Sequence, residues 1–245
     1  MKAVVSFALI TYLLTPQLVC AKKTISIGTS EAPPHTINGK NKGIDLDITA
    51  LVLNKLGYQV NFHFFGLARS AIEVHAGRLD ATTPIFWQED KPGIYSSNAI
   101  INYLPTVFSL AKNEFSPKSL TDLAGHSIIT FQGAKGYFGE EFVMLSQQSH
   151  YHEVNDMSVI PQLLYKERFD YAVLDKYVFY YFYFQSSEDK RNDIFDEFNL
   201  IPQVPSSVAF HDKQLRDEFN DMLKQVKTTE EYQAIIKRYF NRTQP

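Results

Sequence analysis

In the first third of the chain, short segments of alternating apolar and polar residues are separated by segments with an apolar residue at every third or fourth position. Alternation is typical of half-buried strands, and the wider spacing is typical of helices with one buried face. The predicted strands are 24–28, 58–65 and 79–84, and the predicted helices are 45–56 and 69–76. Gly57 and Gly77 follow the two helices, where glycine commonly ends a helix.

This order of strands and helices predicts a parallel sheet, because a crossover through a helix returns the next strand in the same direction. Small molecules bind such sheets at the carboxyl ends of their strands. The loops expected at that edge are 31–35, 65–69 and 86–91. We therefore expect a bound solute to lie against these three loops.

The rest of the chain contains a second series of strands and helices. Strands are predicted at 106–111, 127–131 and 171–174, and helices at 120–123, 140–147, 157–168, 177–184, 213–226 and 230–239. Because the strand and helix order starts afresh near residue 111, we place a second domain there. The predicted fold class is α/β, with two units.

Residues 1–21 have the features of a secretory signal peptide. Lys2 supplies a positive charge, 3–14 is an apolar stretch too short to span a bilayer comfortably, and small residues flank Cys20 at the expected cleavage site. A lipoprotein acylated at Cys20 is the alternative, which Val19 fits poorly. Export and the lack of any other cysteine predict a periplasmic location.

Composition excludes several classes of function. The formal net charge is −3 and there is no run of Lys or Arg, which argues against nucleic acid as a partner. No phosphate-binding glycine loop, nucleophile elbow or catalytic cysteine is present. His150, His152 and Glu153 lie too close together to suggest a metal site, and we interpret them as a polar loop. No metal and no cofactor is expected.

Several short motifs occur after the signal peptide in the order and spacing of a known family. They are Gly-Ile-Asp-Leu-Asp-Ile at 43–48, Gly-Arg-Leu-Asp-Ala at 77–81, Leu-Thr-Asp-Leu-Ala-Gly at 120–125, Phe-Asp-Tyr-Ala-Val-Leu-Asp at 169–175 and Ile-Ile-Lys-Arg-Tyr-Phe at 235–240. From about residue 22 to 240 the chain resembles the bacterial extracellular solute-binding proteins of family 3. These are periplasmic receptors of polar amino-acid ABC transporters.

The resemblance implies a periplasmic-binding-protein-like fold of type II, with two α/β lobes and a ligand cleft between them. Lobe 1 would comprise 22–110 and 206–245, and lobe 2 would comprise 111–205. Closure of the lobes around a solute is a hinge motion that a membrane partner can detect. The implied partners are a small-molecule solute and an inner-membrane ABC permease, and we expect a monomer.

Part of the family's amino-acid clamp is missing from the sequence. An Arg that grips the α-carboxylate of the ligand is expected shortly before Tyr95, but 88–91 reads Gln-Glu-Asp-Lys. Hydroxyl residues are expected after Gly133, where Ala134 and Lys135 stand. The Asp that binds the α-ammonium is matched by Asp175. An ordinary amino-acid ligand is therefore in doubt.

The candidate ligand-binding residues combine charged anchors with an apolar wall. Arg69 and Lys135 could hold an anion, and Asp175 could hold a cation. Aromatic residues could stack on a ring or an aliphatic solute. The full set is Glu31, His35, Phe65, Arg69, Phe86, Trp87, Lys135 and Asp175.

Each candidate also has a structural interpretation that the sequence leaves open. Arg69 could pair with Glu73 one helical turn away, and Asp175 could begin the helix that follows it. Glu31 and His35 could be turn residues. The 177–184 segment has seven aromatics in eight positions, which we interpret as a helix buried on one side with its tyrosines on the other, and alternatively as a docking patch.

The preferred hypothesis is a receptor without catalysis that clamps a small polar or anionic, amino-acid-like solute for an ABC transporter. One alternative is an enzyme on the same fold, similar to cyclohexadienyl dehydratase, with Glu31, Glu89 or Asp175 as an acid or base. Another alternative is a periplasmic sensor with a membrane-bound signalling partner in place of a permease.

Overall fold

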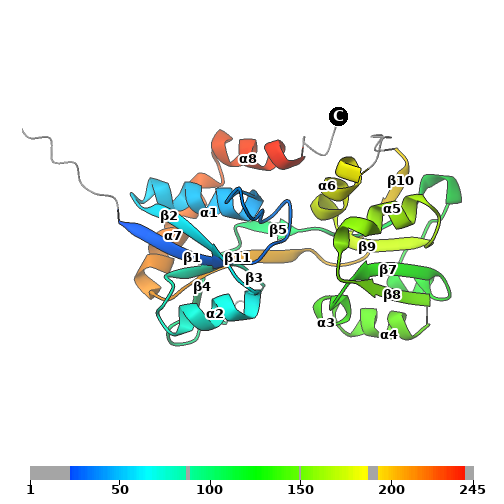
Figure 1. The fold of residues 1–245 in the computed structure, drawn as a ribbon, viewed down its shortest axis with the longest axis horizontal. Helices are drawn as coiled ribbons and strands as arrows, with labels where there is room; N and C mark the ends of the chain where they lie inside the picture. The colour runs from blue at the N-terminus through cyan, green and yellow to red at the C-terminus, as the bar shows by residue number, and fades with distance from the viewer. Residues whose placement is uncertain (1–22, 87–88, 149, 187–192, 241–245) are drawn as a thin grey trace, which may run out of the picture.

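The computed structural model describes residues 23–86, 89–148, 150–186 and 193–240. Two lobes lie side by side, each built around one sheet (Figure 1). The first sheet has the order β2-β1-β3-β11-β4, with β5 also paired to β11, and the second has the order β10-β6-β9-β7-β8. The strands of the first sheet, which forms the first lobe, are β1 (Thr24–Thr29), β2 (Gln59–Phe64), β3 (Ala81–Ile85), β4 (Tyr95–Ser96), β5 (Ile101–Tyr103) and β11 (Val204–Phe210).

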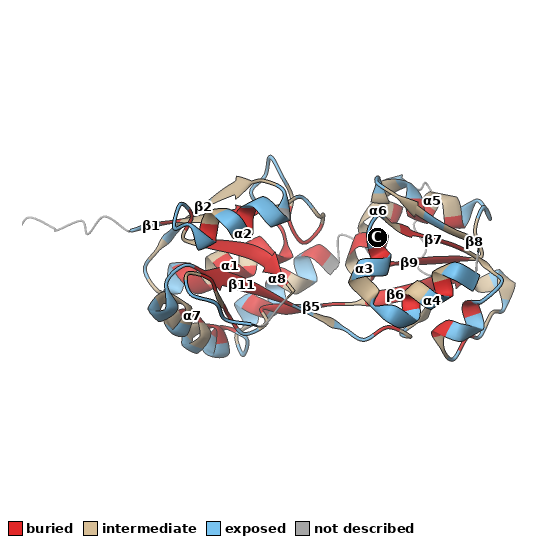
Figure 2. Ribbon diagram, turned by 90° about the horizontal axis from the view of Figure 1, so that it is seen from below, coloured by how far each residue is buried: buried red, intermediate tan, exposed pale blue. Residues whose placement is uncertain are grey.

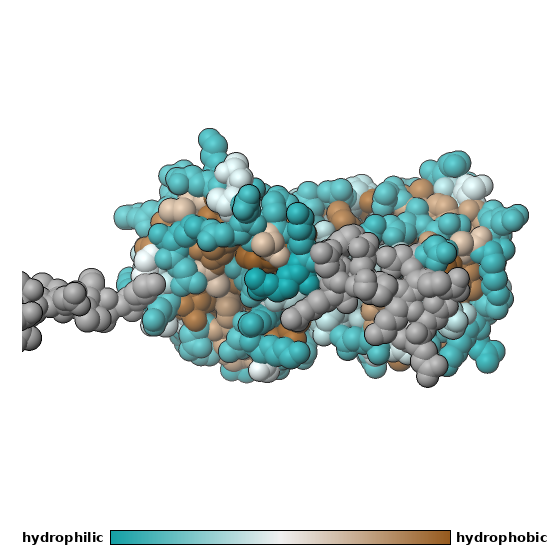
Figure 3. Space-filling view, turned by 90° about the horizontal axis from the view of Figure 1, so that it is seen from above, coloured by the Kyte–Doolittle hydropathy of each residue, from teal (hydrophilic) through white to brown (hydrophobic). Residues whose placement is uncertain are grey.

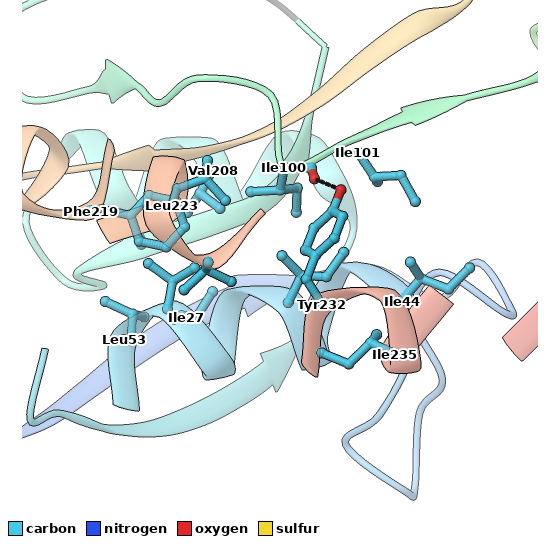
Figure 4. Packing of buried hydrophobic residues seen from close by; sticks show 14 of the residues in the cluster. Ile27, Ile44, Leu53, Ile100, Ile101, Val208, Phe219, Leu223, Tyr232 and Ile235 are labelled. Atoms are coloured by element: carbon cyan, nitrogen blue, oxygen red, sulfur yellow. Dashed lines mark hydrogen bonds between the residues drawn. The ribbon is translucent and has the colours of Figure 1, made fainter. Parts of the chain in front are cut away.

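Four helices cover the first sheet, and their apolar faces form its core. They are α1 (Ile44–Lys55), α2 (Leu67–His75), α7 (Lys213–Val226) and α8 (Glu230–Phe240). Helices α1, α7 and α8 share one cluster of buried side chains with the sheet, while Val74 of α2 packs on the opposite face (Figure 1). Tyr232 belongs to this cluster, and its hydroxyl donates a 2.8 Å hydrogen bond to the carbonyl of Ile100 (Figure 4).

The second lobe has helices on both faces of its sheet. Its strands are β6 (Pro105–Leu110), β7 (Ser127–Phe131), β8 (His150–Val154), β9 (Tyr171–Asp175) and β10 (Phe195–Phe198). Its helices are α3 (Ala134–Phe138), α4 (Glu140–Gln148), α5 (Ile160–Tyr165) and α6 (Lys176–Ser186), with 3₁₀ turns η1 (Ala111–Asn113), η2 (Leu120–Leu123) and η3 (Met157–Val159). Strands β3, β6 and β9 are buried along their whole length, and Figure 2 shows β6 and β9 in red.

The chain passes from the first lobe to the second between β5 and β6, and returns between β10 and β11. Leu104 alone separates β5 from β6. Strand β11 pairs antiparallel with β5 and β3 after its return, so the last two helices belong to the first lobe. The two crossings therefore run close together, at the place where the lobes meet.

The alternating patterns of the sequence are confirmed in the first lobe. Strand β1 pairs parallel with both β2 and β3, as the strand and helix order predicts. Helix α7 has the predicted bounds. The short strands β4, β5 and β10 are too brief to produce a pattern, and the sequence does not predict them.

The interpretation of 150–153 as a polar loop is wrong. These residues form β8, which pairs parallel with β7. Tyr151 is partly buried against the ring of Phe142, at 5.9 Å between centroids, while His150 and His152 are exposed on the other side. The strand alternates, but its polar residues hide the pattern.

Helix α6 differs in detail from its predicted arrangement. One side is buried, as expected, but tyrosines lie on that side as well as on the other. Tyr180 and Tyr183 are buried together with Phe179, whose ring stacks on Phe108 at 3.8 Å. Of the described helices, none is both long enough and apolar enough to cross a membrane. The expected signal peptide and Cys20 lie outside the described residues.

Candidate functional site

A polar loop after β1 carries His35 into the region between the lobes. Thr36 holds the loop closed, because its hydroxyl donates to the carbonyl of Ser30 at 2.5 Å and accepts from the amide of Ala32 at 2.8 Å. The amide of Asp45 donates to the carbonyl of His35 at 3.1 Å, which ties the loop to the start of α1. Gly43 has a φ of 146° there, and a Cβ at this position would collide with the His35 carbonyl.

His35 bonds to one carboxylate from each lobe. Its Nδ1 lies 2.9 Å from Oδ1 of Asp45, in α1, and its Nε2 lies 3.1 Å from Oδ1 of Asp175, at the end of β9. The side chains of His35 and Asp45 are fully buried, and that of Asp175 is 10% exposed. A buried Asp45–His35–Asp175 triad therefore joins the two lobes.

The two carboxylates keep His35 protonated. Burial alone would lower the pKa of the imidazole, but Asp175 and Asp45 outweigh it and raise the pKa to about 9. Burial likewise acts to raise the pKa of Asp175, yet the charge of His35 and the hydrogen bonds it receives hold that pKa below its ordinary value. The triad therefore holds a buried imidazolium between one carboxyl group from each lobe.

Hydroxyl groups from the strands next to the two crossings donate hydrogen bonds to the second oxygen of Asp45. The hydroxyl of Ser206, in β11, donates to Oδ2 of Asp45 at 2.6 Å, and the hydroxyl of Tyr103, in β5, donates to the same oxygen at 3.2 Å. The Tyr103 ring also stacks on the imidazole at 3.7 Å. Burial and the adjacent Asp45 hold the pKa of Tyr103 well above its ordinary value, so it remains a donor.

Asp175 combines its bond to His35 with a structural role at the start of α6. Its Oδ1 accepts from the amides of Tyr177 and Val178 at 2.9 and 3.1 Å, and its Oδ2 accepts from the amide of Leu104 at 2.6 Å. Three amides and one imidazolium thus share this carboxylate. The interpretation as a helix-start residue is confirmed.

A pocket of about 240 Å³ opens beside Asp175. Residues from β3 and the loops of the first lobe line one side, and residues of β7, β9, α3 and α6 line the other. The lining consists of Ser30, Ala32, Pro84, Phe86, Tyr103, Pro105, Phe131, Tyr137, Phe138, Met157, Leu174, Asp175 and Val178. Hydrophilic side chains cover much of the face of the molecule seen in Figure 3, whereas the pocket lining is mostly apolar.

Two polar features of the pocket limit what it can bind. Asp175 is the only charged residue among the described residues of the lining. The buried hydroxyl of Tyr137 has no hydrogen-bond partner within the described part of the chain. Burial, followed by the charges of Asp175 and Asp45, raises the pKa of this hydroxyl, so it is a neutral donor and acceptor.

The structure brings three of the sequence candidates together. Phe86 and Asp175 line the pocket, and His35, which is not a lining residue, bonds to Asp175. The Phe86 ring meets the rings of Tyr103 and Tyr137 edge-on, at 5.2 and 5.3 Å between centroids. Trp87, which follows Phe86 in the sequence, lies outside the described residues.

The structure places the other candidates outside the pocket lining. The side chain of Arg69 is 68% exposed and lies 3.8 Å from Glu73, with its guanidinium 5.1 Å from the centre of the Phe65 ring. Lys135 is exposed and lies 5.4 Å from the centre of the Tyr151 ring. Glu31 is exposed in its loop. Neither cation that suggested an anionic solute lines the pocket.

Sequence reasoning missed several residues of the site. Tyr103 lies in β5 and Ser206 in β11, two strands that the sequence does not predict, and Tyr137 and Phe131 flank a glycine-bearing turn. Asp45 lies in the 43–48 motif, which carried the family resemblance, but nothing in that motif links it to a histidine ten residues earlier. The described residues contain no group of three or more His, Cys, Asp or Glu placed to hold a metal ion.

Comparisons with solved structures agree on the fold. The chain is similar to an ancestral cationic amino-acid solute-binding protein, with 19% identity, a TM-score of 0.70, and coverage of 89% of this chain and 95% of that one. It is similar to an ABC uptake transporter substrate-binding protein from Streptococcus pneumoniae with bound histidine, with 17% identity, a TM-score of 0.66 and coverage of 89% and 92%. A histidine kinase sensor domain matches with 18% identity, a TM-score of 0.65 and coverage of 89% and 96%.

Sequence comparison identifies the family. No curated protein matches the sequence significantly. The sequence model of a solute-binding family, however, matches residues 25–242, which is most of the chain. Together with the two-lobed periplasmic-binding-protein fold of type II, this match shows that the chain belongs to the bacterial extracellular solute-binding proteins, family 3.

Proposed function

We propose that this protein is a periplasmic receptor that clamps one small solute between its lobes and presents it to an ABC permease. The observation that carries the proposal is the pocket itself, which takes its lining from both lobes and lies beside the two crossings. A solute there would contact both lobes at once, so its binding would favour the closed arrangement. The transporter-derived relatives with this fold support a permease as partner.

The proposal includes the export route predicted from the sequence, with residues 1–21 removed on export to the periplasm. The lobe boundaries differ from the predicted 110/111 and 205/206. Strand β6 (Pro105–Leu110) pairs in the second sheet and β11 (Val204–Phe210) in the first, so lobe 2 begins after Leu104 and ends before Val204. The receptor acts as a monomer, since one chain supplies both sides of the pocket.

We propose binding without catalysis. The carboxylate in the pocket, Asp175, accepts hydrogen bonds on both oxygens and is paired with a buried cation. An acid or base must exchange its proton freely, and Asp175 would have to give up these bonds to do so. Glu31 and Glu89 are exposed and do not line the pocket.

A sensor is the second candidate function. The similarity to a histidine kinase sensor domain supports it, because the same two lobes can report solute binding to a signalling partner. The receptor and the sensor share the pocket and the hinge, and they differ only in the membrane protein that reads the closed form.

The proposal can be tested by measuring solute binding and lobe closure on the same sample. A thermal-shift screen against amino acids, amines, carboxylates and neutral ring compounds is expected to give at least one hit, since a ligand at 100 times its Kd adds about 2.7 kcal/mol. Small-angle scattering should then show a smaller radius of gyration with the hit. A permease from the same operon should show solute-dependent ATPase stimulation. A hit without closure, or release of an altered compound, would contradict the receptor function.

A further inference from the structure

We propose that the solute is a neutral, ring-sized molecule with one hydrogen-bonding group, and not an α-amino acid. The inference rests on the proposed receptor function and concerns the same pocket. Four observations carry it, namely the size of the pocket, its apolar walls, the engaged state of Asp175 and the unpartnered hydroxyl of Tyr137.

The volume sets the size of the solute. An apolar cavity of about 150 Å³ is enough to take up benzene, and pockets for drug-sized ligands begin at about 300 Å³. The pocket here has about 240 Å³. It therefore has room for one ring with a short substituent.

The apolar walls of the pocket favour a solute that is itself mostly apolar. Five aromatic rings line the pocket together with aliphatic side chains, and the rings are those of Phe86, Tyr103, Phe131, Tyr137 and Phe138. Tyr137 lies nearly perpendicular to Phe86 and strongly inclined to Phe131, at 88° and 74° between ring planes. Inclined rings of this kind offer edges and faces to a further ring, the arrangement that aromatic groups prefer.

The charged groups at the pocket disfavour both the ammonium and the carboxylate of an α-amino acid. The imidazolium of His35 already pairs with Asp175, so this protein supplies its own cation to the carboxylate that a ligand's ammonium would need. An ammonium needs acceptors for three donors, and Asp175 already accepts four hydrogen bonds. A carboxylate would lie beside the carboxylate of Asp175, with no Lys, Arg or His among the described lining residues.

Tyr137 offers the solute a polar contact, because this residue lines the pocket and its buried hydroxyl has no partner among the described residues. A buried hydroxyl without a partner is destabilising, and a ligand that bonds to it removes that penalty. A hydroxyl or carbonyl group on the solute would serve, because the phenol can donate or accept. A quaternary ammonium could use the rings but would leave this hydroxyl unpartnered.

The test is a series of probes that share one ring and differ in charge. We expect benzyl alcohol to bind most tightly by titration calorimetry, with benzylamine, benzoate, phenylalanine and benzyltrimethylammonium each at least about tenfold weaker, since each must leave a charge poorly solvated. Tighter binding of any charged member would overturn the inference. If no ring compound binds, the inference fails. A closure-inducing hit from another chemical class would then leave the receptor function standing, whereas no hit at all would remove both.

Two variants test the individual contacts. Tyr137→Phe should weaken benzyl alcohol about fivefold, the loss of one hydrogen bond, and leave toluene unchanged. Tyr151→Phe is the matched control, because its hydroxyl bonds Glu153 outside the pocket. Equal effects of the two variants would contradict the role of Tyr137.

His35→Asn should free Asp175 and improve benzylamine binding at least about tenfold, because an unpaired buried carboxylate then gains a partner. Should this variant fail to fold, His35→Asn with Asp45→Asn removes the second unpaired charge and allows the same measurement. Unchanged benzylamine affinity in the folded variant would show that His35 does not set the solute class.

Discussion

Two clusters of charge combine cations with carboxylates, yet they have opposite surroundings. The triad Asp45–His35–Asp175 is buried where the lobes meet, with the His35 and Asp45 side chains at 0% exposure. On α2, Glu73 pairs with Arg69 and Arg78, whose side chains are 68% and 59% exposed. The first cluster spans two lobes, and the second lies within one helix and the residues just after it.

The difference shows that burial, and not residue type, separates a site from a solvated surface. Water screens the charges around Glu73, so its ion pairs contribute little to folding or to binding. In the triad the charges have only each other and a few hydroxyls and amides, so removal of one partner leaves the rest without compensation. Substitutions in the buried triad should therefore cost far more than substitutions among the exposed charges.

Asp45→Ala is expected to cost about 3–5 kcal/mol of unfolding free energy, the usual loss when one partner of a buried ion pair is removed. His35 would lose one of its two carboxylates, and the hydroxyls of Tyr103 and Ser206 would lose their acceptor. Urea denaturation followed by circular dichroism measures the change.

Asp47→Ala is the matched control on the same helix. Asp47 accepts from the Tyr239 hydroxyl at 2.8 Å and pairs with Arg238, whose side chain is 50% exposed, near the surface. We expect Asp47→Ala to lower the unfolding free energy by less than half as much as Asp45→Ala. An equal loss at both positions would mean that the buried triad is no more sensitive than a surface pair.

Stability should fall as the pH rises past neutrality. The folded pKa of His35 is about 9, above its ordinary value of 6.5, so its contribution is complete below about pH 6.5 and is lost as the pH rises through about 9. The separation corresponds to a loss on the order of 3 kcal/mol. Urea midpoints at closely spaced pH values between 6 and 10 measure it.

The tyrosines and Asp175 that face His35 do not titrate between pH 6.5 and 9. The pKa values of Tyr103 and Tyr177 are raised, chiefly by burial, so both stay neutral, while the pKa of Asp175 is lowered, so this residue stays ionised. His35→Gln should abolish the decline between pH 6.5 and 9. A decline of the same size in the variant would assign it to other groups.

The fold follows from the sequence to the extent that its elements are long and periodic. The parallel β1, β2 and β3 and the bounds of α7 are predictable because each buries one face over several turns or residues. Strand β8 is missed because its polar alternation resembles a loop, and β5 is missed because three residues carry no period. Such segments become strands because they pair with neighbouring strands of the sheet.

The site is less predictable, because its contacts join residues far apart in the sequence. His35 and Asp175 are 140 positions apart, and Ser206 is 161 positions from Asp45. The sequence places His35 and Asp175 on loops of the correct sheet edges but gives no sign that they meet. Arg69 and Lys135 attract attention through their charge, and only their exposure shows that they lie outside the pocket lining.

Phe86→Ala is expected to weaken benzyl alcohol at least about tenfold, because a central aromatic wall of the pocket is lost. Its ring contacts both Tyr103 and Tyr137, so its loss also loosens two further walls. Phe65→Ala is the control, since Phe65 is a partly buried aromatic of the same lobe outside the pocket lining. Calorimetric titration of both variants compares them, and an equal loss in Phe65→Ala would place the solute nearer to α2.

Arg69→Ala should have the smallest effect, with the affinity for the solute changed by less than about twofold, as for other exposed ion pairs. The guanidinium faces water, Glu73 and the Phe65 ring, and Glu73 keeps Arg78 as a partner after the change. Parallel titrations of Arg69→Ala and Lys135→Ala measure the effect. Loss of binding in either variant would show that an exposed cation reaches the solute when the lobes close, and the contrast between buried and solvated charge would no longer define the site.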